Sequence, residues 1–283
     1  MRYLILLCLV IPFYTAADTS LWKVSKGNSE LYIGGTIHLL SASDYPLPVE
    51  FEQAYKQAQT IVFETDLTAM VQPDVQQKMI QRLMYHNGKV LKDDLRAETY
   101  QALVDYVTSK GLMIELINQF KPPLAIITLL MTELQRLGMA NTGVDNYFNK
   151  KAMADGKDLD ELESVQVQLD VIANMGKGQE DEMILSTIAE MKELSSIMKD
   201  MKAAWRKGDI KQLEKIGISP MKKDFPDLYR LLLVDRNNDW VPKIEALLAT
   251  PETEFVLVGA LHLVTKDGVI SKLRAMGYKV ELF

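Results

Sequence analysis

Gly35-Thr-Ile-His38-Leu-Leu is the stretch from which the fold can be worked out, because it recurs in nearly the same form as Gly259-Ala-Leu-His262-Leu-Val. A short apolar run precedes each copy. These runs are Leu31-Tyr-Ile33 and Phe255-Val-Leu-Val258. A buried strand followed at once by glycine marks a place where the backbone turns sharply or lets a ligand approach. The sequence has only three His and 15 Gly, so two such spacings have a chance probability of roughly 1% from composition alone. We therefore expect two equivalent strand ends, each presenting a histidine.

Each copy is expected to lie in a strand–helix–strand unit. A short amphipathic helix around 49–58 separates the strand at 31–33 from an apolar run at 61–63. A helical pattern over 269–276 and a last strand over 278–283 follow the second copy. Such βαβ units form parallel sheets, and ligands collect beyond the carboxyl ends of their strands. The predicted fold class is α/β, a mixed sheet built from two βαβ halves that carry the GxxH motifs.

Between the two halves, most of residues 73–240 have helical apolar spacing. Helices this numerous must pack somewhere, and a cleft at the strand ends needs walls that exclude water. We therefore expect a large helical insertion that forms a lobe or lid. Four Met between 183 and 201 predict core filling along one long helix, with an adaptable peptide-binding groove as the alternative.

Residues 1–17 have the order of a signal peptide. A basic residue starts the segment, the apolar run Leu4 to Phe13 is too short to span a bilayer, and small residues permit cleavage before Asp18. An uncleaved membrane anchor is the alternative. Residues 18–283 would then form a single domain without cysteine, because the only one is Cys8, and without a stable membrane span. We expect an exported protein, periplasmic or secreted.

The paired GxxH motifs, together with short motifs between them, resemble the TraB/GumN family, which includes the Tiki-type metalloproteases. The matching stretches follow the family's order through nearly the whole chain after residue 17. They are Phe63-Glu64-Thr-Asp66, Gly143-Val-Asp145, Leu162-Glu163 with Gln166, and Asp235-Arg236-Asn237 followed by Trp240. The Tiki relatives are described as divalent-metal-dependent proteases, whereas other members have no settled activity. The resemblance therefore implies a site more firmly than a substrate.

Geometry and resemblance together imply a metal site at the strand ends. His38 and His262 end matching strands, and Glu64 follows a neighbouring one. Two imidazoles and one carboxylate can hold a divalent ion such as Mn, Co or Zn and leave positions open for water and substrate. Arg236 could stabilise a developing oxyanion. The resemblance implies that further residues bind substrate or support these groups: Gly35, Asp66, Asp145, Glu163, Gln166, Asn237 and Gly259. The predicted function is metal-dependent hydrolysis of a peptide or small-molecule substrate, foremost at amide bonds.

Two alternatives use the same residues differently. His38 could act as general base in a metal-free, esterase-like hydrolase, or the chain could be a non-catalytic secreted protein that binds peptide or haem. Ordinary structural roles also stay open, a first-turn helix acid for Asp145 and an ion pair for Arg236. The sequence has no HExxH, GxSxG or P-loop motif, which disfavours the commoner zinc peptidases, serine hydrolases and nucleotide enzymes. A formal net charge of −6 argues against a nucleic-acid partner.

Overall fold

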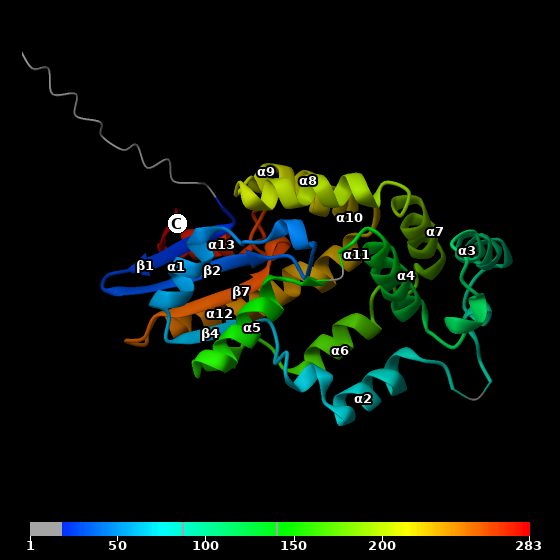
Figure 1. Cartoon of the computed structure of the whole chain (residues 1–283), viewed down its shortest axis with the longest axis horizontal. Coiled ribbons are helices and arrows are strands. Elements are labelled where there is room, and N and C mark those ends of the chain that lie inside the picture. Colours follow the sequence, from blue (N-terminus) through cyan, green and yellow to red (C-terminus); the bar gives the residue numbers. More distant parts are fainter. Residues whose placement is uncertain (1–18, 87, 140) are drawn as a thin grey trace, which may run out of the picture.

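The computed structural model describes residues 19–86, 88–139 and 141–283, so the expected signal peptide lies outside the described residues. A six-stranded sheet in the order β6-β4-β7-β2-β1-β8 occupies the left half of the molecule in Figure 1. Its strands are β1 (Leu21–Lys26), β2 (Ser29–Thr36), β4 (Thr60–Phe63), β6 (Asp158–Glu161), β7 (Glu254–Gly259) and β8 (Lys279–Leu282). Only β1 within this sheet runs antiparallel to its neighbours, and β2, β7, β4 and β6 are mutually parallel. The prediction of an α/β fold with a mixed sheet is confirmed.

The late strand β7 lies between β2 and β4, and this insertion brings the two GxxH motifs together. Thr36 of β2 pairs with Gly259 of β7, so both strands end at the same level. On the other side of β7, Phe63 of β4 pairs with Leu257. Because parallel strands run in one direction, their carboxyl ends share one edge of the sheet. The two strands of the first βαβ unit are thus parallel but not neighbours, a point that the sequence did not reveal.

Helices cover both faces of the sheet, and the alternation of side chains along β7 explains why. Phe255 and Leu257 point to one face, where they pack in a core that includes Phe51, Phe148 and Trp205. This face is covered by α1 (Val49–Gln57), α5 (Val144–Asp155) and α8 (Leu194–Arg206). Val256 and Val258 point to the opposite face, whose core includes Trp240, Ile244 and Ile270. That face is covered by α12 (Asp235–Leu247) and α13 (Val269–Ala275).

The expected helical lobe is present, and Figure 1 shows it beyond the ends toward which β2 and β7 point. It contains α2 (Pro73–Leu83), α3 (Ala97–Ser109), α4 (Pro122–Arg136), α6 (Val165–Ala173) and α7 (Glu180–Glu190). The lobe has its own core, in which Leu103, Leu129 and Ile184 are buried. A two-stranded ribbon, β3 (Leu39–Leu40) with β5 (Asn141–Thr142), lies next to His38 in the chain. Within the described ranges, no helix is long and apolar enough to cross a membrane.

The methionine-rich segment differs from the prediction of one long helix. The methionine-rich stripe is divided between α7 and α8 by a break at 191–193, and Met183 and Met191 are buried, as core filling requires. Short helices α9 (Ile210–Leu213), α10 (Ser219–Asp224) and α11 (Pro226–Tyr229) follow. A π-helical turn at Arg230–Val234 then joins α11 to α12. Arg236 therefore lies in the first turn of α12, inside a continuous helical run.

Candidate functional site

The structure brings His38, Glu64 and His262 together around Gly259. A methyl group placed on the Gly259 Cα would lie 3.2 Å from Glu64 Oε1, 3.6 Å from His262 Cδ2 and 3.9 Å from His38 Nε2. Glu64 follows the end of β4, His262 follows the end of β7, and His38 follows the end of β2. Since the glycine has no side chain, the three groups can approach one another over its Cα.

Asp145 holds the ring of His38. Its Oδ2 lies 2.9 Å from His38 Nδ1, and the carboxylate is buried in the first turn of α5. The helix comes this close because Gly143 precedes it: a Cβ there would lie 2.2 Å from the carbonyl carbon and oxygen of His38. The Asp145 charge raises the pKa of His38 above its ordinary value. The His38 side chain is also 69% exposed, so water partly screens the pair.

His262 is held differently, because it is buried. Asn237 Oδ1 lies 2.7 Å from its Nδ1, and Arg236 Nη1 lies 3.1 Å from its Nε2. A guanidinium nitrogen can only donate, so Nε2 accepts and the proton is on Nδ1, which donates to Asn237. Burial, assisted by the charge of Arg236, lowers the pKa of His262 to about 3. The turn at Ala260–His262 places the ring against Trp240, with 4.4 Å between the ring centroids, so His262 belongs to the core although it follows a strand end.

Arg236 is the centre of a buried ionic network. Its Nη2 donates to Glu64 Oε2 and Glu163 Oε1, each at 2.6 Å, and its Nε donates to Glu163 at 3.1 Å. Trp240 Nε1 donates to Glu163 Oε2 at 3.0 Å. Burial alone would raise the pKa of Glu64, but His262, Arg236, His38 and the Gly259 N–H together lower it to about 2. Glu64 is therefore ionised throughout the ordinary pH range.

The donor chemistry of this site fits a divalent ion, with one obstacle. Both histidines have Nδ1 against an oxygen atom, the arrangement that orients metal-binding imidazoles and leaves Nε2 for the ion. His262 Nε2 and Glu64 Oε1 lie 3.9 Å apart. However, Arg236 donates both to that Nε2 and to Glu64, and among the described residues no three His, Cys, Asp or Glu are arranged as they stand to hold a metal ion. Binding would require Arg236 to leave His262, while Glu163 could still hold the guanidinium.

The other residues singled out in the sequence divide into two groups. Asn237, Glu163 and Asp145 support the central side chains, and Gly35 accepts a hydrogen bond from Trp205 Nε1 through its carbonyl. Asp66 is instead exposed and accepts from the backbone N–H groups of the turn that follows it. Gln166 is exposed on α6 and hydrogen-bonds Asp170.

Gln168, which the sequence analysis did not single out, reaches Arg236 with its Oε1 at 3.2 Å. Gln166 and Gln168 are two positions apart on one helix, so they point to different faces. Only the docking of α6 decides which of the two glutamines joins the network, and no local signal distinguishes them.

Comparisons with known proteins give a consistent assignment. The family model described as the TraB/PrgY/gumN family matches residues 20–282. The chain is 24% identical over 259 residues to "Uncharacterized protein YbaP" of Escherichia coli (strain K12), covering 88% of this chain and 89% of that protein. The protein of the same name from Shigella flexneri gives the same identity and coverage. No solved structure matches the chain.

Proposed function

The chain belongs to the TraB/PrgY/gumN family, and we propose that it is a divalent-metal-dependent hydrolase of peptide (amide) bonds. The observation that carries this proposal is the convergence of His38 Nε2, Glu64 Oε1 and the His262 ring around Gly259. Three side chains that are far apart in the sequence converge at the carboxyl ends of parallel strands, where substrates commonly bind. His38, Glu64 and His262 would hold the ion, with Mn, Co or Zn as the candidate metals.

The surrounding residues have roles that follow from their contacts. Asp145 fixes the orientation of His38 and strengthens its basicity as a ligand, and Asn237 keeps His262 in the tautomer whose Nε2 lone pair faces the site. Arg236 brings a positive charge to the same space and is suited to stabilise a developing oxyanion. A bound divalent ion would supply a water of lowered pKa and polarise the scissile carbonyl.

A second candidate function, metal-free hydrolysis, is favoured by the 2.9 Å contact between His38 and Asp145. A histidine oriented by a carboxylate is a common acid–base unit. Because Asp145 raises the pKa of His38, the ring would be protonated near neutral pH and would serve as a general acid there. Its activity as a general base would increase only toward alkaline pH.

One experiment separates these functions. Chelator-treated protein is assayed against a mixed set of quenched fluorogenic peptides and simple esters, with and without added Mn²⁺, Co²⁺ or Zn²⁺. The metal proposal expects amide hydrolysis that appears only with an ion and disappears in His38→Ala and His262→Ala. The third histidine, the exposed His86 in the lobe, provides the matched control His86→Ala. Full activity after chelation would support the metal-free function, and activity unaffected by either substitution would refute both.

We also propose that the protein is exported to the periplasm or secreted, as the order of charge, apolar run and small residues in 1–17 supports. Amino-terminal sequencing of the exported protein should begin at Asp18. A chain that still begins at Met1 would contradict cleavage.

A further inference from the structure

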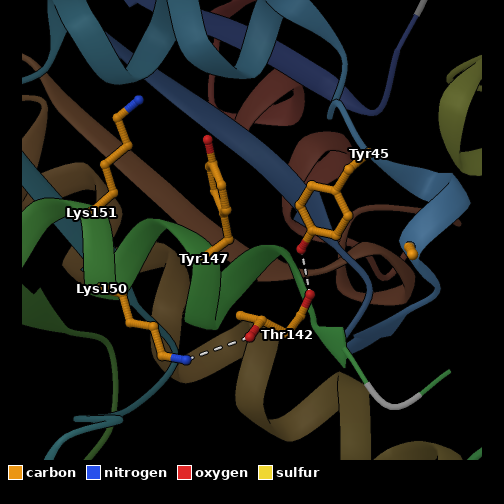
Figure 2. A pocket seen from close by; sticks show the side chains of 6 residues that line it. Tyr45, Thr142, Tyr147, Lys150 and Lys151 are labelled. Atoms are coloured by element: carbon orange, nitrogen blue, oxygen red, sulfur yellow. Dashed lines mark hydrogen bonds between the residues drawn. The ribbon is translucent and has the colours of Figure 1, made fainter.

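Two hollows lie on either side of the turn that follows His38. The first has a volume of about 680 Å³ and is lined by Ala42, Tyr45, Thr142, Tyr147, Lys150 and Lys151 (Figure 2). The second has a volume of about 370 Å³, and its polar lining includes Asp44, Lys199, Lys202 and Arg206. Because Asp44 and Tyr45 are consecutive, one turn separates the two hollows. His38 immediately precedes β3, and Thr142 of the first hollow pairs with Leu39 of that strand, so the first hollow lies close to His38.

The lining of both hollows is basic although the whole chain is acidic. Lys150 and Lys151 contribute to the first hollow and Lys199, Lys202 and Arg206 to the second, whereas Asp44 is the one acid among the lining residues. The formal net charge of the chain is −6. The three cations of α8 fall at 199, 202 and 206, a helical spacing that places them on one face. Positive charge is thus concentrated beside the candidate site.

Two of these five cations hold the turn, one pairs with an acid on α1, and two pair with no carboxylate among the described residues. Lys202 Nζ donates to Asp44 Oδ2 at 2.8 Å, and Arg206 donates to the carbonyl oxygens of Asp44 and Pro46. Lys151 pairs with Glu52 at 2.6 Å. In contrast, neither Lys150 nor Lys199 pairs with a carboxylate of the residues that the structure describes, and Lys150 has only a 3.5 Å contact with Thr142 Oγ1. Each hollow therefore keeps one exposed cation for a ligand.

Two tyrosines give the first hollow a rigid wall. The rings of Tyr45 and Tyr147 lie 5.7 Å apart between centroids. The Tyr45 hydroxyl donates to the Thr142 carbonyl oxygen and the Tyr147 hydroxyl donates to Glu52 at 2.8 Å, so both rings are tied at their far ends. Figure 2 shows both rings between Lys150 and Lys151 on one side and the turn on the other. The ring faces can pack against apolar side chains of a peptide. The neighbouring lysine can pair with an acidic side chain of the same peptide.

We propose that the two hollows form a binding surface for acidic peptides, with ligand carboxylates meeting Lys150 on one side of the turn and Lys199 on the other. A peptide that crosses the turn would pass next to His38. The inference rests on the proposed function only in calling this peptide the substrate; binding itself does not require catalysis. Opposite charge at a surface raises the rate and specificity of association, and solvent-exposed pairs of this kind weaken with salt.

Binding is tested by fluorescence anisotropy with the intact mature protein. The probes are a labelled peptide with four Glu residues among apolar ones and a matched peptide with Gln in their place. The double variant Lys150→Glu/Lys199→Glu removes the two uncommitted cations, and Lys279→Glu on β8, at the far edge of the sheet with a 69% exposed side chain, is the charge control. Circular dichroism verifies that all variants fold. Since each exposed ion pair becomes a repulsion, we expect the double variant to bind the Glu peptide about 10-fold more weakly at low salt.

The expected results are preference for the Glu peptide, loss of that preference in the double variant, and little change in the control. Equal binding of both peptides, or equal weakening by Lys279→Glu, would overturn the inference. So would preferential binding of duplex DNA or of vesicles containing anionic lipid, because the surface would then serve a different class of partner. Mass spectrometry of the peptide after incubation reports cleavage separately. Selective binding without cleavage would support the binding surface and would count against the proposed hydrolase function.

Discussion

Replacing Arg236 by Gln tests the assignment of the site most directly, because Arg236 contacts two of the three candidate metal ligands. The guanidinium donates to Glu64 and Glu163 at 2.6 Å and to His262 Nε2 at 3.1 Å, and the residue is only 8% exposed. Removing it leaves two buried carboxylates without a cation, a change that typically costs about 3–5 kcal/mol of unfolding free energy. We expect a loss of that size by urea unfolding in the presence of chelator.

Metal affinity should change in the opposite direction. In the wild-type protein an ion must displace Arg236 Nη1 from His262 Nε2, and a hydrogen bond from a charged donor is worth about 1.5–3 kcal/mol. The variant avoids this cost, so its affinity for Mn²⁺, Co²⁺ or Zn²⁺ should be about 10- to 100-fold higher. An ion at 100 times its Kd should then restore about 2.7 kcal/mol of the lost stability.

Isothermal titration calorimetry of chelator-treated protein measures the affinity, and urea unfolding with and without the ion measures the rescue. Arg230→Gln is the matched control, because Arg230 lies in the preceding turns of the same helical run with a 64% exposed side chain and pairs with the exposed Asp227. Arg236→Lys keeps the charge and should lie between wild type and Arg236→Gln in both measurements. If Arg236→Gln binds the ions no more tightly than wild type, and the ions do not restore its stability, both the metal site and the competing role of Arg236 are refuted.

Three further predictions concern the same site. His38→Ala and His262→Ala should each abolish hydrolysis, and the double variant should be scarcely worse than either, because groups that act as a unit are non-additive; additive losses in kcat/KM would show that the two rings act separately. His262→Ala should also lower stability by about 1–3 kcal/mol, because it leaves buried polar partners unpaired, and His38→Ala should cost less, because its ring is exposed and only the Asp145 carboxylate loses a partner. Acidification should reveal His262 in a stability profile: between the ordinary pKa values of His262 (6.5) and Glu64 (4.5), unfolded His262 gains a proton that the folded, buried ring does not bind. His38 has the same ordinary pKa, and its raised folded pKa contributes in the opposite direction near pH 6.5, so the His262 contribution is the difference between wild type and His262→Gln. The unfolding free energy attributable to His262 should therefore fall as the pH falls through this window, by at most about 1.4 kcal/mol per pH unit, and an unchanged slope in His262→Gln would contradict the buried neutral ring. Gly259→Ala and Gly143→Ala should differ in kind: the first puts a methyl 3.2 Å from Glu64 Oε1 and should impair the site with little loss of stability, whereas the second places Cβ 2.2 Å from the His38 backbone and should cost about 1–3 kcal/mol. Equal thermal shifts for the two glycine variants, measured by calorimetry, would refute that distinction.

Local sequence patterns predicted where helices and strands lie, because interactions between residues close in the sequence determine these elements. The apolar runs before both GxxH motifs are β2 and β7, Pro48 precedes α1, and Gly156 and Gly277 end helices at positive φ. Each of these features depends on residues within a few positions: alternation of side chains, a fixed proline φ, or a glycine that tolerates the left-handed region. The positions of His38, Glu64 and His262 at strand ends follow from the same signals.

The contacts between these residues depend on the tertiary structure alone. Glu64 meets the Gly259 N–H 195 positions away only because β7 lies between β2 and β4, and no periodicity within a strand specifies its neighbours. The burial of His262, the choice of Gln168 over Gln166 and the placing of Arg236 between Glu64 and Glu163 follow from how α12 and α6 dock. Docking is decided by the summed packing and electrostatics of many distant side chains. A short motif therefore predicts where a functional side chain lies on its own element, but not which partner it will meet.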